Sequence, residues 1–327
     1  MQIGIFVVSV IVSLTASTLL VIRLERVGER IGVSEALLGL MAALAADGPE
    51  ITSAATAMSA GHGTIGVGVT LGSNIFNLAA LLGLSALVAG RIGLHRRAIL
   101  LEGVLGALLA LIAIGVVGGL VGPAAGLVLA LVAFIPYLLY SAVPAIRRPR
   151  LSLPPRLSAW LAGALAEEEL ELAEAIRPRR GDTTDLAVAI GALVTVVIAS
   201  VLMEQSASTM GATAGISPII IGGLVLAAVT SLPNAVAAVY LASRGRGAAV
   251  LSTAFNSNAI NVIVGFLVPA AILGLATSSD ALLVAGSYLG LTVIAVVLAF
   301  RARGLDRRSG SVVIAAYVLF LVALVTR

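Results

Sequence analysis

Apolar residues run along this chain in long stretches, and short polar segments rich in arginine separate each stretch from the next. A bilayer core about 30 Å thick needs roughly 20 apolar residues per helix, so each long stretch is a candidate membrane span. The pattern predicts ten spans, and the predicted fold is an all-α polytopic membrane protein. The spans lie near residues 3–22, 33–60, 64–90, 97–119, 123–146, 185–203, 214–242, 248–276, 280–300 and 309–326.

The composition agrees with this pattern. The chain has 327 residues, of which 60% are hydrophobic and 11% charged, whereas soluble domains carry roughly 25% charged residues. The lipid bilayer is therefore expected to be the main partner of the chain, with a small aqueous portion. The chain has no cysteine, which excludes disulfides and thiolate metal sites.

The arginines predict how the chain is oriented. Nineteen of the twenty basic residues are arginines in the five loops that would share one side of the membrane, and the other is Arg327. Cytoplasmic loops carry an excess of basic residues. We therefore expect an integral protein of a prokaryotic plasma membrane, with both termini outside and residues 147–183 cytoplasmic. The net charge of +4 then reflects topology and not nucleic-acid binding, and no protein partner is evident.

The loop 147–183 divides the chain into two predicted five-helix halves, residues 1–146 and 184–327. The middle of this loop could form an amphipathic helix with Trp160, Leu161 and Leu165 on its apolar side. Such a helix is expected to lie at the membrane interface as a linker.

Two polar blocks repeat at one fixed offset of 184 residues. The first contains ADGPE and GSNIFN, and the second contains TSLPN and NSNAIN. The aligned pairs are Gly39 and Gly223, Pro49 and Pro233, Glu50 and Asn234, Ser73 and Ser257, Asn74 and Asn258, and Asn77 and Asn261. Because each half has an odd number of spans, the second copy must enter the membrane inverted. The repeats cover about residues 38–84 and 222–268, and inverted repeats place ion sites near the bilayer midplane.

The second predicted span carries two acids, Asp47 and Glu50, around a Gly-Pro pair. A carboxylate at the bilayer centre costs a few kcal/mol or more. Proline also frees the backbone carbonyl four residues earlier, here that of Ala45. Since Asp47 and Glu50 are three residues apart, they project from one helix face. An exchangeable cation or proton is expected to neutralise them.

The polar side chains of the two repeated blocks offer carboxylate, hydroxyl and amide oxygens as ligands. Such hard ligands suit Ca²⁺, Mg²⁺ or Na⁺ and disfavour Zn²⁺ or Cu. One polar pair receives a different interpretation: Asn74 and Asn258 are expected to form hydrogen bonds between helices. Glu102 is expected to reach the membrane interface, and His62 to be a polar loop residue.

The motifs GPE and GSNIFN, repeated as TSLPN and NSNAIN, resemble the two α-repeats of the sodium/calcium exchanger family of calcium/cation antiporters. The resemblance implies Ca²⁺ exchange for Na⁺ by alternating access, with the first and sixth spans sliding across the rest. It implies no enzymatic activity and no cofactor other than the transported ions. The implied site residues are Asp47, Glu50, Ser73, Asn77, Thr230, Ser231, Asn234, Ser257 and Asn261.

The chain departs from the family pattern in its charges. Family members usually have a glutamate in each repeat, whereas Asn234 and Asn261 leave the second repeat neutral. Asp47 stands where a serine is usual, so both negative charges come from one half. A site with a charge of −2 is neutralised by one Ca²⁺ or by two monovalent cations. Altered stoichiometry, or proton coupling through the paired acids, is therefore the alternative prediction.

Three other functions compete with a Ca²⁺ antiporter. A carrier for another cation, such as a Na⁺/H⁺ or Mg²⁺ carrier, would use the same oxygen ligands. An intramembrane aspartyl hydrolase needs two facing carboxylates, and the second repeat has none. A passive channel would not need a closed, repeat-built site.

Overall fold

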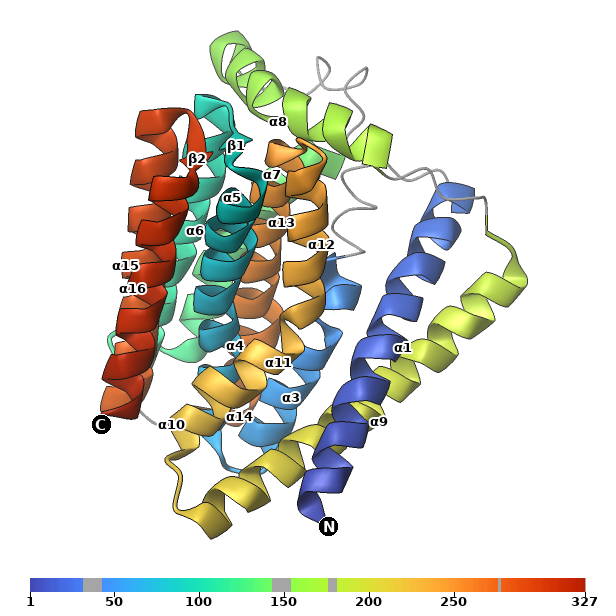
Figure 1. Ribbon diagram of the computed structural model, residues 1–327, viewed down its shortest axis with the longest axis vertical. Helices are drawn as coiled ribbons and strands as arrows, with labels where there is room; N and C mark the ends of the chain where they lie inside the picture. The colour runs from blue at the N-terminus through green and yellow to red at the C-terminus, as the bar shows by residue number, and fades with distance from the viewer. Residues whose placement is uncertain (32–42, 143–153, 176–180, 276–277, 327) are drawn as a thin grey trace.

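The computed structural model describes residues 1–31, 43–142, 154–175, 181–275 and 278–326, and the fold is almost entirely helical (Figure 1). The first half of the chain contains α1 (Gln2–Ile31), α3 (Gly48–Ser59), α4 (Gly63–Asn77), the π-helix η1 (Leu78–Leu84), α5 (Ser85–Ala89), α6 (Arg96–Val117) and α7 (Pro123–Ala142). Both chain ends lie at the same end of the helical bundle (Figure 1).

The second half begins after α8 (Pro155–Ala175), which lies across the end of the bundle opposite the termini (Figure 1). It contains α9 (Thr183–Ala214), α10 (Pro218–Ile220), the π-helix η3 (Ile221–Leu226), α11 (Ala227–Thr230), α12 (Leu232–Ser243), α13 (Gly247–Ile260), the π-helix η4 (Asn261–Leu267), α14 (Val268–Leu273), α15 (Ser279–Ala302) and α16 (Arg307–Val325).

Within the described residues, eight helices are long and apolar enough to cross a membrane. A ninth span results if 218–230 and 232–243, which meet at a 46° bend, are counted as one. The prediction of a polytopic helical fold is therefore confirmed. The predicted span 33–60 falls partly on residues 32–42, outside the described residues, and its described part is residues 43–60, which include α3. A count of ten stays a prediction.

Two predicted boundaries are wrong. The first span was expected to end near residue 22, but α1 continues to Ile31. The sixth span was expected to end near residue 203, but α9 continues to Ala214. The added segment is rich in hydroxyl side chains, which lowers its hydropathy. Those hydroxyls bond within the helix: Ser206 donates to the carbonyl of Leu202, and Thr209 donates to that of Gln205. The polar segment from 204 to 214 can thus remain helical, because these hydroxyl groups bond to carbonyls of the same helix.

A short antiparallel ribbon ties together two corners of the bundle. Strand β1 (Arg91–Gly93) pairs with β2 (Gly304–Asp306), with Ile92 opposite Leu305. The ribbon thereby joins the α5–α6 corner to the α15–α16 corner. Asp306 also caps α16, since the backbone N–H of Ser309 donates to its Oδ1 at 2.8 Å. This hydrogen bond holds the pKa of the Asp306 carboxyl below its usual value.

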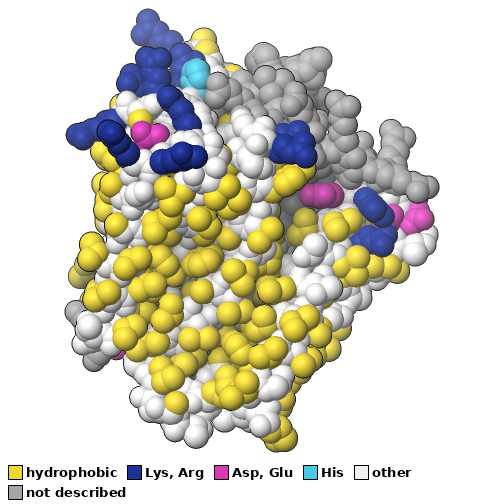
Figure 2. Space-filling view, in the orientation of Figure 1, with side chains coloured by type: hydrophobic (Ala, Val, Ile, Leu, Met, Phe, Trp, Pro, Cys, Tyr) yellow, Lys and Arg dark blue, Asp and Glu magenta, His cyan; other side chains and the backbone are white. Residues whose placement is uncertain are grey.

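Charge and apolar surface are separated along the bundle. Arginine side chains gather at the end that carries the ribbon and α8, and hydrophobic side chains cover the belt beside them (Figure 2). Exposed arginines at that end include Arg91, Arg96, Arg301 and Arg308. The described arginines of the α5–α6 and α15–α16 corners thus share one end, and the assignment of that end to the cytoplasm stays a prediction.

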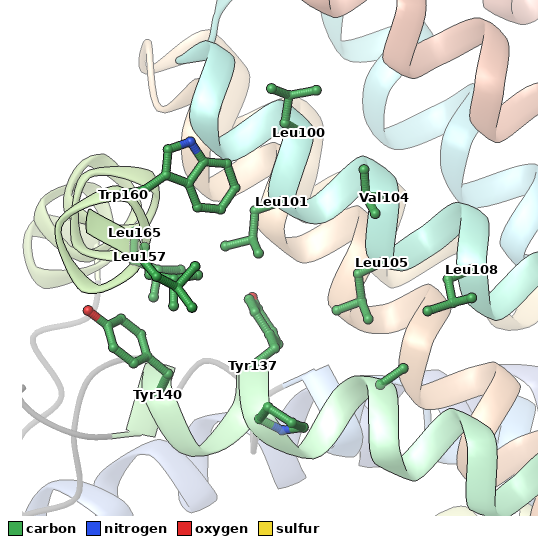
Figure 3. A pocket seen from close by; sticks show the side chains of 13 residues that line it. Leu100, Leu101, Val104, Leu105, Leu108, Tyr137, Tyr140, Leu157, Trp160 and Leu165 are labelled. Carbon is green, nitrogen blue, oxygen red and sulfur yellow. The ribbon is translucent and has the colours of Figure 1, made fainter. Parts of the chain in front are cut away.

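The apolar side that the sequence predicts for the 147–183 segment lies on helix α8. Its side chains Trp160, Leu161 and Leu165 line an apolar pocket of about 640 Å³ that α6 and α7 complete. Trp160 and Leu165 point from α8 toward Leu101 of α6 and Tyr140 of α7 (Figure 3). This apolar contact holds α8 against the bundle.

The centre of the molecule consists of α4, α13 and the helices that pack on them. Gly72 of α4 lies so close to η3 that an added Cβ would be 2.7 Å from the Cα of Gly223. Small residues permit such backbone contact between membrane helices. Helices α1 and α9 pack against each other on one flank (Figure 1), where Ser13 and Ser200 form a buried hydrogen bond of 2.9 Å.

Candidate cation site

Two broken helices begin at the candidate site. Helix α3 starts at Gly48, directly after Asp47, and helix α12 starts at Leu232, directly after Ser231. Each has a proline in its first turn, where a missing backbone N–H costs nothing because that N–H has no partner within the helix. The breaks therefore follow from Pro49 and Pro233, and they place polar residues at helix starts inside the bundle.

The first break frees a backbone carbonyl, as the proline predicts. The hydroxyl of Ser17 on α1 donates to the carbonyl of Ala45 at 3.0 Å. This carbonyl is thus satisfied by a neighbouring helix. The contact also joins α1 directly to the segment that precedes Asp47.

Asp47 is fully buried and connects the two halves of the chain. Its Oδ1 accepts hydrogen bonds from Ser257 Oγ at 2.7 Å and from Asn234 Nδ2 at 2.8 Å. Both donors belong to the second polar block. The structure therefore brings together residues that are about 190 to 210 positions apart in the chain.

Glu50 is also fully buried, and its partner comes from the second break. Ser231 Oγ donates to Glu50 Oε1 at 2.9 Å. One oxygen of each acid is thus held by a donor from the opposite half. These bonds fix the orientation of both carboxylates and leave the second oxygen of each free to face another ligand.

Four buried oxygens at this site have no hydrogen-bond partner among the described residues. They are Asp47 Oδ2, Glu50 Oε2, Asn77 Oδ1 and Asn261 Oδ1. Buried acceptors without donors are costly, and nearly all such groups in folded proteins are paired. All four atoms are acceptors, and two belong to acids. A cation satisfies such a set, whereas an anion does not.

The two asparagines with free oxygens are held by their amide nitrogens. Asn77 Nδ2 donates to Ser257 Oγ and to Asn258 Oδ1, both at 3.1 Å. Asn261 Nδ2 donates to Asn74 Oδ1 at 3.1 Å. The Nδ2 and Oδ1 atoms of an amide point in different directions. Because these bonds hold the Nδ2 atom of each side chain, its Oδ1 atom points away from the groups that Nδ2 contacts.

Ser73 and Thr230 use their hydroxyl protons on the backbone. Ser73 Oγ donates to the carbonyl of Ala227 at 3.4 Å, and Thr230 Oγ1 donates to that of Leu226 at 2.9 Å. Both side chains are fully buried. Their oxygen lone pairs are the part that remains available to a cation.

All nine residues predicted for the site are buried. Among the described residues, no three His, Asp or Glu side chains converge on a possible metal position. The acids Asp47 and Glu50 therefore supply the charge of the site, with neutral oxygens around them. Their role as ligands stays a prediction.

The sequence interpretation missed two neighbours of the site. Ser53 lies three residues after Glu50 on α3, is fully buried, and has an Oγ without a hydrogen-bond partner among the described residues. The spacing of three residues was the signal that could have identified it. Tyr288 of α15 is also fully buried, with its phenol beside Asn74 and Asn258. No repeat or spacing points to Tyr288.

The expectation for Glu102 was wrong. It does not reach the interface but is 3% exposed, and the Tyr137 hydroxyl lies 3.0 Å from its Oε1. The same hydroxyl lies 3.1 Å from Oδ1 of Asn256, the residue before Ser257. Tyr137 comes from α7, and only the tertiary fold brings it to Glu102.

Comparisons with known proteins agree with these features. The family model described as "Sodium/calcium exchanger protein" matches residues 1–145 and 184–326. A segment of 80 residues is 36% identical to sodium/potassium/calcium exchanger 1 of Mus musculus. That segment covers 24% of this chain and 7% of the mouse protein. The Gallus gallus protein of the same name is 37% identical over 79 residues, which cover 24% of this chain and 12% of that protein.

Solved structures share the fold over nearly the whole chain. The crystal structure of the H⁺/Ca²⁺ exchanger CAX has a TM-score of 0.72 at 16% identity, covering 98% of this chain and 82% of that one. The sodium-calcium exchanger NCX_Mj soaked with 10 mM Na⁺ and zero Ca²⁺ has a TM-score of 0.63 at 21% identity, covering 99% and 98%. At these identities the likeness establishes the fold alone.

Proposed function

Because the chain belongs to the sodium/calcium exchanger protein family, we propose that it is a secondary active antiporter that exchanges Ca²⁺ for Na⁺ across a membrane. The chain is an integral membrane protein of a family of exchangers, which are transporters and not enzymes. The observation that carries the proposal is the set of four buried acceptor oxygens without donors at Asp47, Glu50, Asn77 and Asn261.

The ligand set suits Ca²⁺ and Na⁺. Ca²⁺ takes six to eight oxygen ligands, and it accepts carboxylate, amide and hydroxyl oxygens in flexible geometry. The two carboxylates would provide the charge, and the neutral oxygens of Ser73, Asn77 and Asn261 would complete the shell. The hydrogen bonds from Ser231 and Ser257 would hold the carboxylates in place while the ion changes.

The proposed alternating access rests on the sequence prediction of ten spans in two inverted halves. Helices α3 (48–59) and α12 (232–243) have bounds that differ by the offset of the sequence repeat, and α4 and α13 also begin 184 residues apart. In Figure 1, α3 ends near the termini, whereas α12 ends near the arginine-rich end. A site between two such halves can open to either side when one part moves against the other.

Helices α1 and α9 are proposed to be the moving part. They pack on each other on one flank of the bundle and contact the site region mainly through α3 (Figure 1). The hydroxyl of Ser17 on α1 bonds to the carbonyl of Ala45, two residues before Asp47. A shift of α1 would therefore reach the break at which α3 begins.

Proton coupling is the second candidate. Both acids of the site lie in the first polar block, and Asn234 and Asn261 leave the second polar block neutral. No described basic side chain forms an ion pair with Asp47 or Glu50. Two protons would neutralise the pair as completely as two Na⁺ ions or one Ca²⁺. The same charge balance makes both versions of the exchange electroneutral.

Transport assays with the reconstituted protein distinguish Na⁺-coupled from H⁺-coupled Ca²⁺ exchange. Proteoliposomes are given a Na⁺ gradient, a H⁺ gradient or neither, and ⁴⁵Ca²⁺ uptake is measured with and without an imposed membrane potential. We expect uptake that follows the Na⁺ gradient and does not respond to the potential. Uptake that follows only the H⁺ gradient would favour the second candidate, and uptake that ignores both gradients would refute antiport. Liposomes with the Glu50→Gln variant give the background.

A further inference from the structure

We propose that Glu204 forms a second cation-binding site, in a cavity at the end of the molecule that carries both termini, and that it gathers cations from that side. Binding at Glu204 is independent of the exchange reaction. Its role in supplying the central site rests on the proposed function.

The cavity has a volume of about 610 Å³ and lies between α9, the α3–α4 turn and the start of α10. Its polar wall comes from α9, which contributes Glu204, Gln205, Ser208, Thr209 and Thr213. These residues recur at a helical spacing and share one face. His62, which lies between α3 and α4 as a polar loop residue, also lines this cavity.

Glu204 is buried in a helix that is long and apolar enough to cross a membrane. Glu204 is only 1% exposed. It lies ten residues before Ala214, the last residue of α9, which is a distance of about 15 Å along the helix. Among the described residues, no basic side chain forms an ion pair with it. Arg23 and Arg26 instead pair with Asp185, near the other end of α9. A buried carboxylate without a cationic partner is unfavourable until a cation arrives.

The surrounding hydroxyls are turned so that they offer acceptors to the cavity. Ser208 Oγ donates to Glu204 Oε1 at 2.6 Å. Thr209 Oγ1 donates to the carbonyl of Gln205, and Thr213 Oγ1 donates to the carbonyl of Thr209. The protons of these hydroxyls are thus used on their own helix. The remaining oxygen lone pairs and the carboxylate suit a hard cation such as Ca²⁺, Na⁺ or Mn²⁺.

An apolar layer separates this cavity from the central site. Ile65 and Ile221 line the cavity and also pack in a buried cluster with Ala54, Val69 and Leu226. Ala54 lies one turn after Glu50 on α3, and Val69 lies one turn before Ser73 on α4. The layer is therefore about one helical turn, or 5 Å, thick. A cation beside Glu204 waits outside a closed layer and does not contact Glu50.

Direct binding is the first test. Mn²⁺ bound to purified protein is counted by electron paramagnetic resonance in the unmodified chain and in a variant with Asp47→Asn and Glu50→Gln, which disables the central site. We expect the variant to retain weak Mn²⁺ binding, and Glu204→Gln to remove it. As a single change, Glu204→Gln should lower the number of bound Mn²⁺ ions by one relative to the unmodified protein. This second comparison does not depend on the folding of the variant that combines Asp47→Asn, Glu50→Gln and Glu204→Gln.

Two control variants make the binding test specific. Glu204→Asp keeps the negative charge and should keep binding, which a general packing defect would not allow. Asp280→Asn removes an acid near the same end of the bundle without touching the cavity, and it should leave binding unchanged. Equal Mn²⁺ binding with and without Glu204→Gln overturns the proposal, whether or not the protein exchanges Ca²⁺.

Transport kinetics test the gathering role. Glu204→Gln should raise the external Ca²⁺ concentration for half-maximal uptake about threefold to tenfold on the side of the termini, because a negative cavity concentrates cations. The maximal rate and the half-saturating concentration on the other side should stay the same. The difference should shrink in high choline chloride, which screens charge. An unchanged half-saturating concentration at low ionic strength would contradict this role.

Discussion

Asn74 and Asn258 hold their helices together through a reciprocal pair of hydrogen bonds: each side-chain Nδ2 donates to the backbone carbonyl of the other residue, at 3.0 and 3.2 Å. Both residues are fully buried, and they occupy equivalent places in the two polar blocks. The pair fixes α4 against α13. Asn77 and Asn261 follow three residues later on each helix, so the same pair sets the positions of two of the unpartnered oxygens.

Replacing Asn258 should therefore lower stability. Asn258→Ala removes the side-chain donor to the carbonyl of Asn74 and one of the two acceptors of the Asn77 amide, and we expect a loss of about 1–3 kcal/mol in the free energy of unfolding. Thermal unfolding in detergent measures this loss. Thr253→Ala serves as the control, since its hydroxyl bonds only within its own helix. Equal destabilisation by both changes would contradict the role of the reciprocal pair.

Glu50→Gln should separate cation binding from packing. The glutamine oxygen can still accept from Ser231, so the fold should persist, and removal of a buried charge should leave the melting temperature in Ca²⁺-free buffer equal or higher. Calorimetry should show at least a roughly 100-fold loss of Ca²⁺ affinity, by analogy with other ligand losses. The rise in melting temperature on adding Ca²⁺ should also disappear.

Glu25→Gln is the matched control for that experiment, because it removes an acid from α1 that has no described contact with the site. A retained Ca²⁺-dependent rise in melting temperature in Glu50→Gln would show that Glu50 serves packing alone.

Asn234→Asp should change the charge moved in each cycle. The added acid would lie beside Asp47, to which the Asn234 amide donates at 2.8 Å in the unmodified chain. A site with a charge of −3 takes three monovalent cations in place of one Ca²⁺, so exchange becomes electrogenic. Uptake of ⁴⁵Ca²⁺ should then respond to an imposed potential, unlike that of the unmodified protein. Uptake that stays insensitive to potential while remaining active would contradict the charge argument.

Gly72→Ala should force α4 and η3 apart. Its Cβ would lie 2.7 Å from Gly223 Cα and 2.8 Å from the Gly223 carbonyl oxygen, and neither backbone atom can move alone. We expect a loss of about 1–3 kcal/mol in the free energy of unfolding. Gly191→Ala on α9 is the control, since its Cβ meets nothing within 4 Å. That change should be neutral or stabilising by up to about 1 kcal/mol, because alanine favours the helix. Thermal unfolding in detergent compares the two.

The sequence predicts the parts of the fold that depend on local pattern and on the repeat. Long apolar stretches identify the spans because the bilayer requires that length. Pro49 and Pro233 locate the broken helices because proline acts on its own turn. The offset of the two polar blocks assigns Asp47, Asn234 and Ser257 to one site, and the structure places these three residues in hydrogen-bond contact.

Features that depend on distant packing could not be predicted in this way. Glu102 is buried because Tyr137 of another helix covers it, and no local pattern records that contact. The sequence does not predict the extension of α9 to Ala214, because its serines and threonines lower the hydropathy of this segment to that of a loop. Their hydrogen bonds within the helix do not enter a hydropathy value. The ribbon joins Ile92 to Leu305 through strands of three residues each, which are too short for an alternation signal.

That ribbon has a mechanical consequence. Backbone hydrogen bonds between β1 and β2 join the α5–α6 corner to the α15–α16 corner. We therefore expect the two corners to move together as one rigid body. In the proposed alternating-access cycle, an opening at the arginine-rich end would therefore occur on the opposite flank, where α1 and α9 lie (Figure 1). Spin labels on either side of the ribbon should keep a constant separation through the transport cycle, while labels spanning the opposite flank should drift apart and return.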